Sequence, residues 1–194
     1  FVNHLRHRYG SVEELNRQWG LTYWSHLLSD WADLWRPDGN AQPQYSLAWR
    51  RFQAEITSRF ISWQADIVRE YRRDDQFVTT CIAYDRVTAD DEDLARALDV
   101  TSGNAYFRMQ DELALPRTVD TEQNWTLAGT WALFGLADRM YGTKQAPFLV
   151  TETNAQAIGQ QWVNKPGFDG QWRQAAWALV SRGANMIEYW HWHT

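Results

Sequence analysis

Apolar residues in the first half of the chain recur with a helical period. Between residues 46 and 73, every third or fourth position is apolar, which places these residues on one face of a long helix. A shorter helix is expected over 12–19, because Ser11 and Glu14 form a capping box and Gly20 can end the helix. The apolar positions of the long helix are Trp49, Phe52, Ile56, Phe60, Trp63, Ile67 and Tyr71.

Short, continuous apolar runs in the rest of the chain predict strands. They cover residues 77–84 (FVTTCIAY), 97–102 (ALDVTS), 148–151 (FLVT) and 185–192 (NMIEYWHW). Helices are expected between them, at 90–97, 124–141 and 170–182. Strands that are apolar throughout, in alternation with helices, are typical of a parallel sheet covered by helices.

The connections differ on the two sides of the predicted strands. Those before the strands are short, whereas those after them are long and rich in Trp, Asn, Tyr and Glu. In a (β/α)₈ TIM barrel, the functional loops follow the strands. We therefore expect an α/β fold, the C-terminal half of a (β/α)₈ barrel. Residues 1–194 would form a single partial domain, with the first half of the barrel preceding Phe1.

Composition excludes several classes of protein. Apolar residues make up 44% and charged residues 22%, which is usual for a globular domain. The net charge of −5 argues against nucleic acid as a partner. No apolar run approaches the roughly 20 residues that span a bilayer, so no membrane is expected. Cys81 is the only cysteine, which allows a reducing, cytoplasmic location.

Tryptophan is unusually frequent, with 13 among 194 residues. Most of these residues fit a tryptophan-rich core, in which each buried N–H needs a partner. The other interpretation is sugar binding, because the C–H face of a sugar ring packs on an indole.

Polar side chains gather where the predicted strands end. Glu152 directly follows 148–151, while Asn104 and Tyr106 follow 97–102. Since the carboxyl ends of parallel strands share one edge of the sheet, these side chains are expected to converge. A carboxylate beside Tyr, Asn and Trp suits a sugar site, in which it serves as nucleophile or acid. From position alone, Glu152 could equally be a salt-bridged or solvated strand-end residue.

The two histidines near the end of the chain could be considered as metal ligands. His191 and His193 would face the same way on a strand, but the sequence offers no third ligand beside them. We expect no metal and no cofactor.

Several segments resemble glycoside hydrolase family 42, the β-galactosidases. They are FVNHLRHRYGSVEELNRQWGLTYWS at the start, ALDVTSGNAYF, PFLVTETNAQ, and GQWRQAAWALVSRGANMIEYWHWHT at the end. The resemblance implies a retaining β-galactosidase on a (β/α)₈ barrel, with the four predicted strands as strands five to eight. Its substrate would be a terminal β-D-galactoside.

The same resemblance implies roles for individual residues. Glu152 matches the nucleophile after strand seven, and Tyr106 a tyrosine beside it. Trp162 matches a tryptophan that stacks on galactose, although its spacing from Glu152 is longer here. Trp192 matches a tryptophan at the floor of the pocket. Trp24 is similar to a residue that completes a neighbour's site in family trimers, so a homotrimer is expected.

The resemblance also places functional groups outside the 194 residues. The acid/base glutamate of the family lies in an Asn-Glu pair ahead of Phe1, and further sugar-binding residues would follow Thr194. The 194 residues alone are therefore expected to be inactive. The alternatives are another retaining barrel glycosidase, a non-catalytic carbohydrate-binding protein with an aromatic platform, and a structural tryptophan-rich domain.

Overall fold

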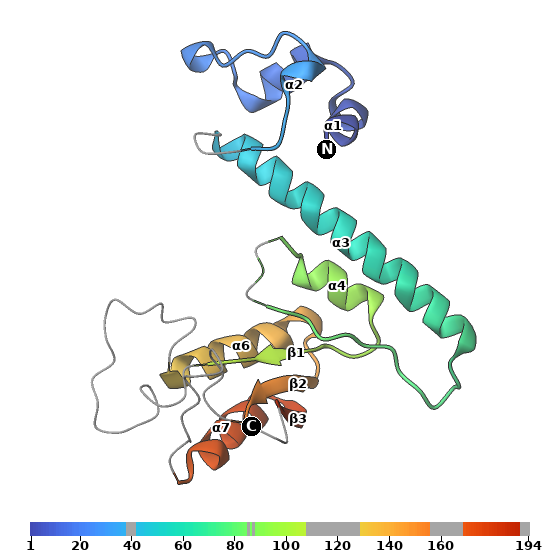
Figure 1. Ribbon diagram of the computed structural model, residues 1–194, viewed down its shortest axis with the longest axis vertical. Coiled ribbons are helices and arrows are strands. Elements are labelled where there is room, and N and C mark those ends of the chain that lie inside the picture. Colours follow the sequence, from blue (N-terminus) through green and yellow to red (C-terminus); the bar gives the residue numbers. More distant parts are fainter. Residues whose placement is uncertain (38–41, 85, 87, 108–128, 156–168, 191–194) are drawn as a thin grey trace. The chain divides into compact units, whose positions relative to one another are not determined.

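The computed structural model describes the chain apart from residues 38–41, 85, 87, 108–128, 156–168 and 191–194, and apart from the side chains of 129–131. Its elements belong to two compact units (Figure 1). The first unit contains Phe1–Phe60 and Val87–Asp90, and the second contains Ile61–Arg86 and Asp91–Thr194.

The first unit is built from short helices and the beginning of a long one. α2 confirms the prediction: the Glu14 N–H donates to the Ser11 hydroxyl at 3.2 Å, and Gly20 ends the helix at φ 65°. α1 was not predicted, because Leu5 is the one residue that it buries. The elements are α1 (Val2–Tyr9), α2 (Val12–Trp19), the 3₁₀ turns Tyr23–Ser25 and Trp31–Asp33, and α3 (Pro43–Tyr71), which continues into the second unit.

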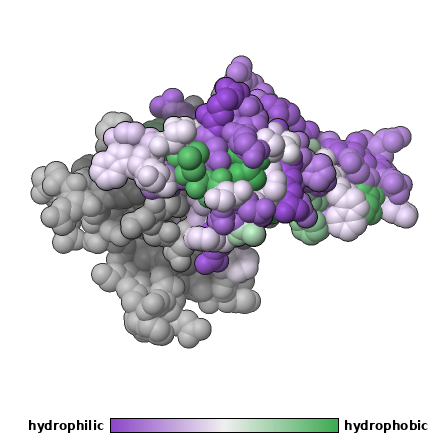
Figure 2. Space-filling model, turned by 90° about the horizontal axis from the view of Figure 1, so that it is seen from above, coloured by the Kyte–Doolittle hydropathy of each residue, from purple (hydrophilic) through white to green (hydrophobic). Residues whose placement is uncertain are grey.

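Aromatic residues enclose the core of the first unit. The Trp19 Nε1–H donates to the Tyr9 hydroxyl at 2.9 Å, and the rings of Phe1 and Trp49 meet edge to face at 5.0 Å. For Trp19 and Trp49, a structural role is thereby confirmed. Most of the coloured surface in Figure 2 is hydrophilic. The core itself consists of Leu5, Leu15, Leu21 and Leu34.

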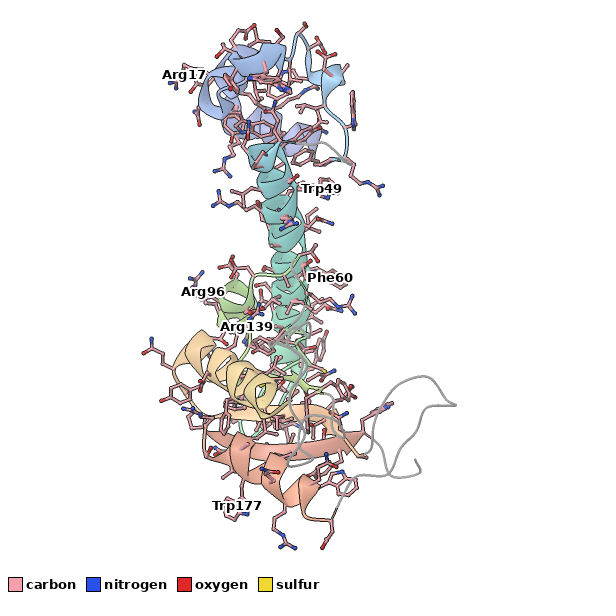
Figure 3. All side chains as sticks on the ribbon, turned by 90° about the vertical axis from the view of Figure 1, so that its left-hand side faces the viewer. Arg17, Trp49, Phe60, Arg96, Arg139 and Trp177 are labelled. Atoms are coloured by element: carbon pink, nitrogen blue, oxygen red, sulfur yellow. The ribbon has the colours of Figure 1, made fainter. Side chains whose placement is uncertain are left out.

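The second unit contains a parallel three-stranded sheet, which confirms the predicted α/β class. The strands β1 (Ser102–Ala105), β2 (Phe148–Asn154) and β3 (Ala184–Trp190) are ordered β1-β2-β3. α6 (Gly129–Lys144) and α7 (Gln171–Val180) pack on it, and α4 (Asp91–Ala97) packs on α6 (Figure 1). Helices and sheet share a core of Leu133, Ala137, Met140, Phe148, Val150, Ala175 and Leu179. Trp177 of α7 is exposed and points away from the sheet (Figure 3).

The boundaries of two predicted strands are wrong. The run 148–151 is a strand, but β2 continues to Asn154. The run 97–102 is not a strand, because β1 starts only at its last residue, Ser102. The preceding residues turn instead, since the Asp99 carboxylate accepts the Val78 N–H at 2.8 Å and so holds the chain between helix and strand.

The segment 77–84 forms a single parallel bridge, between Ile82 and Gly103, rather than the predicted strand. Hydroxyl groups replace part of the ladder here. Thr79 and Ser102 each donate to a main-chain carbonyl on the opposite segment, at 2.7 Å. Such local bonds compete with regular pairing, so the segment lies along β1 without extending the sheet as a full strand.

Gly103 allows this segment to approach β1 closely. A Cβ atom there would lie 2.4 Å from the Tyr84 ring and 2.6 Å from the Ile82 carbonyl oxygen. Tyr84 is fully buried, and burial raises its pKa to about 12. The position therefore requires glycine for reasons of space.

Two groups of charges near helix ends form ion pairs. Arg69 and Arg72, at the end of α3, both bind the Asp99 carboxylate, Arg69 at 3.0 Å. Asp91, at the start of α4, is 12% exposed and pairs with Arg139 of α6, which Figure 3 labels. These pairs fasten α3 to the loop before β1 and α4 to α6.

None of the helices in the described ranges combines the length and apolarity needed to cross a bilayer.

Candidate active site

β2 carries an extra residue immediately before Glu152. β1 advances by one residue between its pairings with Val150 and Glu152, while β2 advances by two. On the other side, Val150 pairs with Ile187 and Thr153 with Tyr189, so three steps along β2 correspond to two steps along β3. Both neighbours therefore meet a bulge in β2 at the same place.

The bulge determines which way Glu152 points. Strict alternation would put it on the same face as Phe148 and Val150, which are fully buried. A bulge adds one residue and redirects the side chain that follows. Glu152 is accordingly half-buried and turned toward Asn104, its cross-strand partner. The prediction that Glu152 lies after the strand is wrong, since it lies within β2.

Two donors from β1 and its continuation converge on one oxygen of Glu152. The Asn104 Nδ2–H donates to Oε2 at 2.8 Å, and the Tyr106 hydroxyl donates to the same atom at 2.7 Å. Burial raises the pKa of Tyr106, and its bond to the Glu152 carboxylate raises it further. Tyr106 therefore remains a neutral donor across the pH range in which proteins work.

Further bonds hold the carboxyl ends of β1 and β2 together. The Phe107 N–H donates to Asn154 Oδ1 at 3.0 Å, and the Thr153 hydroxyl donates to the Ala105 carbonyl at 2.8 Å. All four residues are buried. The position of Tyr106, directly between Ala105 and Phe107, is therefore fixed from both sides.

Sequence reasoning missed two residues of this site. Asn154 anchors the Phe107 main chain, and its position two residues after Glu152 was the available signal. The Cys81 thiol donates to Asn104 Oδ1, and nothing in the sequence linked this lone cysteine to the site.

Of the remaining predicted residues, the structure describes Trp24 alone. Trp24 lies in the first unit, where it is 77% exposed and has a left-handed backbone with φ 56° and ψ 31°. Trp162 and Trp192 lie outside the described residues, as do His191 and His193. Among the residues with described positions, no group of three or more His, Cys, Asp or Glu side chains could hold a metal ion.

The fold and this cluster define an α/β protein that presents a carboxylate at the carboxyl edge of a parallel sheet, where such proteins place their chemistry. Residues 1–194 match the model of glycoside hydrolase family 42, described as β-galactosidase. The chain belongs to this family, so the resemblance drawn from the sequence is confirmed.

Individual relatives agree with the family assignment. The chain is 28% identical to the β-galactosidase BgaH of Haloferax lucentense over 198 residues, covering 99% of this chain and 29% of the relative. It is 25% identical to the β-galactosidase GalA of Bacillus licheniformis, covering 99% of this chain and 28% of the relative. The chain thus spans less than a third of these proteins.

Solved structures share the fold. The β-galactosidase of the psychrophilic Marinomonas ef1 superposes with a TM-score of 0.81 at 23% identity, covering 98% of this chain and 30% of that one. The cold-adapted β-galactosidase of Rahnella sp. R3 gives a TM-score of 0.76 at 25% identity, covering 97% and 26%.

Proposed function

We propose that the full-length protein is a retaining β-galactosidase in which Glu152 is the nucleophile. The observation that carries this proposal is the convergence of Asn104 and Tyr106 on a half-buried carboxylate at the carboxyl edge of the sheet. Membership of a β-galactosidase family supports the substrate class.

The hydrogen bonds suggest which oxygen of Glu152 attacks. Both donors meet Oε2, whereas Oε1 has no donor among the described residues. Oε1 would attack the anomeric carbon while Asn104 and Tyr106 hold the other oxygen in place. Water would then hydrolyse the glycosyl-enzyme, so the anomeric configuration is retained.

The second carboxyl group has to come from another part of the full-length protein. In a retaining enzyme the two groups stand about 5–5.5 Å apart, and one protonates the leaving oxygen. We place this acid/base glutamate ahead of Phe1, by resemblance to the family. The 194 residues would then supply strands five to eight of a (β/α)₈ barrel, with the segment 77–84 as strand five.

Sugar binding would involve residues beyond the described cluster. We assign galactose stacking to Trp162, the pocket floor to Trp192, and a contribution to a neighbouring subunit's site to the exposed Trp24 in a homotrimer. These assignments rest on the resemblance, with no metal or cofactor required.

The test is a mechanism-based label on the full-length protein. A 2-deoxy-2-fluoro-β-galactoside with a good leaving group should form a stable ester with the nucleophile, because the fluorine slows its hydrolysis. Mass spectrometry of the digest should find the label on the peptide that contains Glu152. The Glu152→Gln variant should take up no label and show no turnover.

A matched variant separates this result from nonspecific damage. Glu92 is an exposed glutamate that pairs with Arg96 on α4, so Glu92→Gln should label and turn over like the unaltered protein. Label on another carboxylate would overturn the role of Glu152. Sugar binding without any label would instead support a carbohydrate-binding protein.

A further inference from the structure

We propose that Cys81 is a positioning residue for the reaction, acting through Asn104 on Glu152. This inference rests on the proposed role of Glu152 as the nucleophile. It starts from the Cys81 thiol, which donates to Asn104 Oδ1, while Asn104 Nδ2 donates to Glu152 Oε2.

Hydrogen-bond polarity gives this chain a direction. An ionised carboxylate only accepts hydrogen bonds, so Asn104 must turn its NH₂ group toward Glu152. The amide oxygen then has to face the opposite side, where it needs a donor. Cys81 supplies one, and the Thr151 hydroxyl stands at 3.5 Å, the outer limit for such a bond. The thiol therefore favours the one amide orientation that serves Glu152.

The backbone brings Cys81 to this place. Ile82, the next residue, forms the parallel bridge with Gly103 and accepts the Asn104 N–H at 3.1 Å. The main chain and the side chain of Asn104 are thus both held by neighbouring residues of the 77–84 segment. Cys81 itself is exposed and its thiol is not needed to fill the core, which separates a positioning role from a packing role.

Steady-state kinetics of the full-length protein on a nitrophenyl β-galactoside test the inference. Cys81→Ala should lower kcat about threefold to tenfold, the size of one neutral hydrogen bond, with KM nearly unchanged. Cys81→Ser keeps a donor and should restore kcat to within about twofold. In an Asn104→Ala background, Cys81→Ala should have no further effect, because the thiol acts through that amide.

A control on the same segment identifies purely structural effects. Thr79→Ala removes hydroxyl bonds to Ser102 and to the main chain without touching Asn104, so it should lower the melting temperature and leave kcat unchanged. Equal losses of kcat in Cys81→Ala and Cys81→Ser, or losses that add to that of Asn104→Ala, would overturn the positioning role.

Two further measurements separate the inference from the proposed function. If Glu152→Gln is inactive while Cys81→Ala has normal kcat, only the role of Cys81 fails. If Glu152→Gln stays active, the proposed nucleophile fails. A crystal structure of Cys81→Ala then still shows the orientation of the Asn104 side-chain amide directly. The hydrogen bond between Asn104 and Glu152 should be lost or lengthened. An amide with unchanged orientation would refute the inference.

Discussion

At the scale of single residues, Tyr106 supplies Glu152 with a donor that does not titrate in the working range. Its pKa is raised, first by burial and then by the carboxylate. A raised pKa keeps the phenol protonated to higher pH, so the bond to Glu152 persists there.

Tyr106→Phe should therefore lower kcat/KM by about 10- to 100-fold, the value of one hydrogen bond to a charged group. The alkaline limb of the pH profile should keep its midpoint in the variant, because Tyr106 does not produce that limb. Rates measured from pH 5 to 10 check this. An alkaline limb present in the unaltered protein and missing from Tyr106→Phe would show that the phenol titrates after all.

Trp24 combines a large exposed side chain with a backbone that favours glycine. Trp24→Gly should change stability by no more than about 0.5 kcal/mol, as expected of an exposed position. If Trp24 reaches a neighbour's sugar site, KM should rise about 2- to 10-fold through lost stacking. Trp35, 67% exposed in the same unit, provides the control, and Trp35→Ala should leave KM unchanged. A normal KM in Trp24→Gly would argue against the shared site.

At the scale of elements, the joint between β1 and the 77–84 segment depends on the absence of a side chain at Gly103. Gly103→Ala should destabilise the protein by about 1–3 kcal/mol, because the new methyl group meets the Tyr84 ring and a main-chain oxygen. Denaturant unfolding measures the change.

Gly135 of α6 is the matched control for that substitution. It has open space around its Cα, so Gly135→Ala should stabilise the helix by about 1 kcal/mol. Similar effects at both glycines would show that close approach is not what excludes a side chain at Gly103.

For the whole molecule, the decisive point is that Glu152 is the one carboxylate that we propose as catalytic among the described residues. We expect the isolated chain to show no turnover of a nitrophenyl β-galactoside at concentrations where the full-length protein is active, since the retaining mechanism needs two carboxyl groups. A rate comparison at equal molar concentration is the measurement. Turnover by the isolated chain that Glu152→Gln abolishes would contradict the assignment of the acid/base group to another segment.

The sequence predicted the elements that a period or a cap defines. α2 follows from its capping box and closing glycine, and α7 lies within the helix predicted at 170–182. The prediction of a strand at 77–84 was wrong because the Thr79 hydroxyl donates a hydrogen bond to the main chain of the opposite segment. The β propensity of a sequence does not reveal such a bond. Long-range charge pairs such as Arg69 with Asp99 depend on the fold and could not be read in advance.

The candidate site was predictable in part, from the order of the strands. Strand order indicated that Asn104, Tyr106 and Glu152 would meet, because parallel strands end at one edge. The bulge in β2 was not predictable, since no glycine or proline marks it. Cys81 joins the cluster through a segment that forms a single bridge with β1. The pattern of apolar residues does not reveal a pairing of that kind.

That bulge separates the direction of the Glu152 carboxylate from the number of residues that precede it in β2. If Thr151 were accommodated in a regular ladder, the spacing of two from Val150 would turn the carboxylate toward the helices, where a buried charge has no compensation. Removing Thr151 would instead give β2 one-to-one pairing with β1 and leave Glu152 opposite Asn104, on the face away from Val150. The orientation of the carboxylate therefore depends on its pairing with Asn104 and tolerates either a change of residue type at position 151 or the loss of that residue.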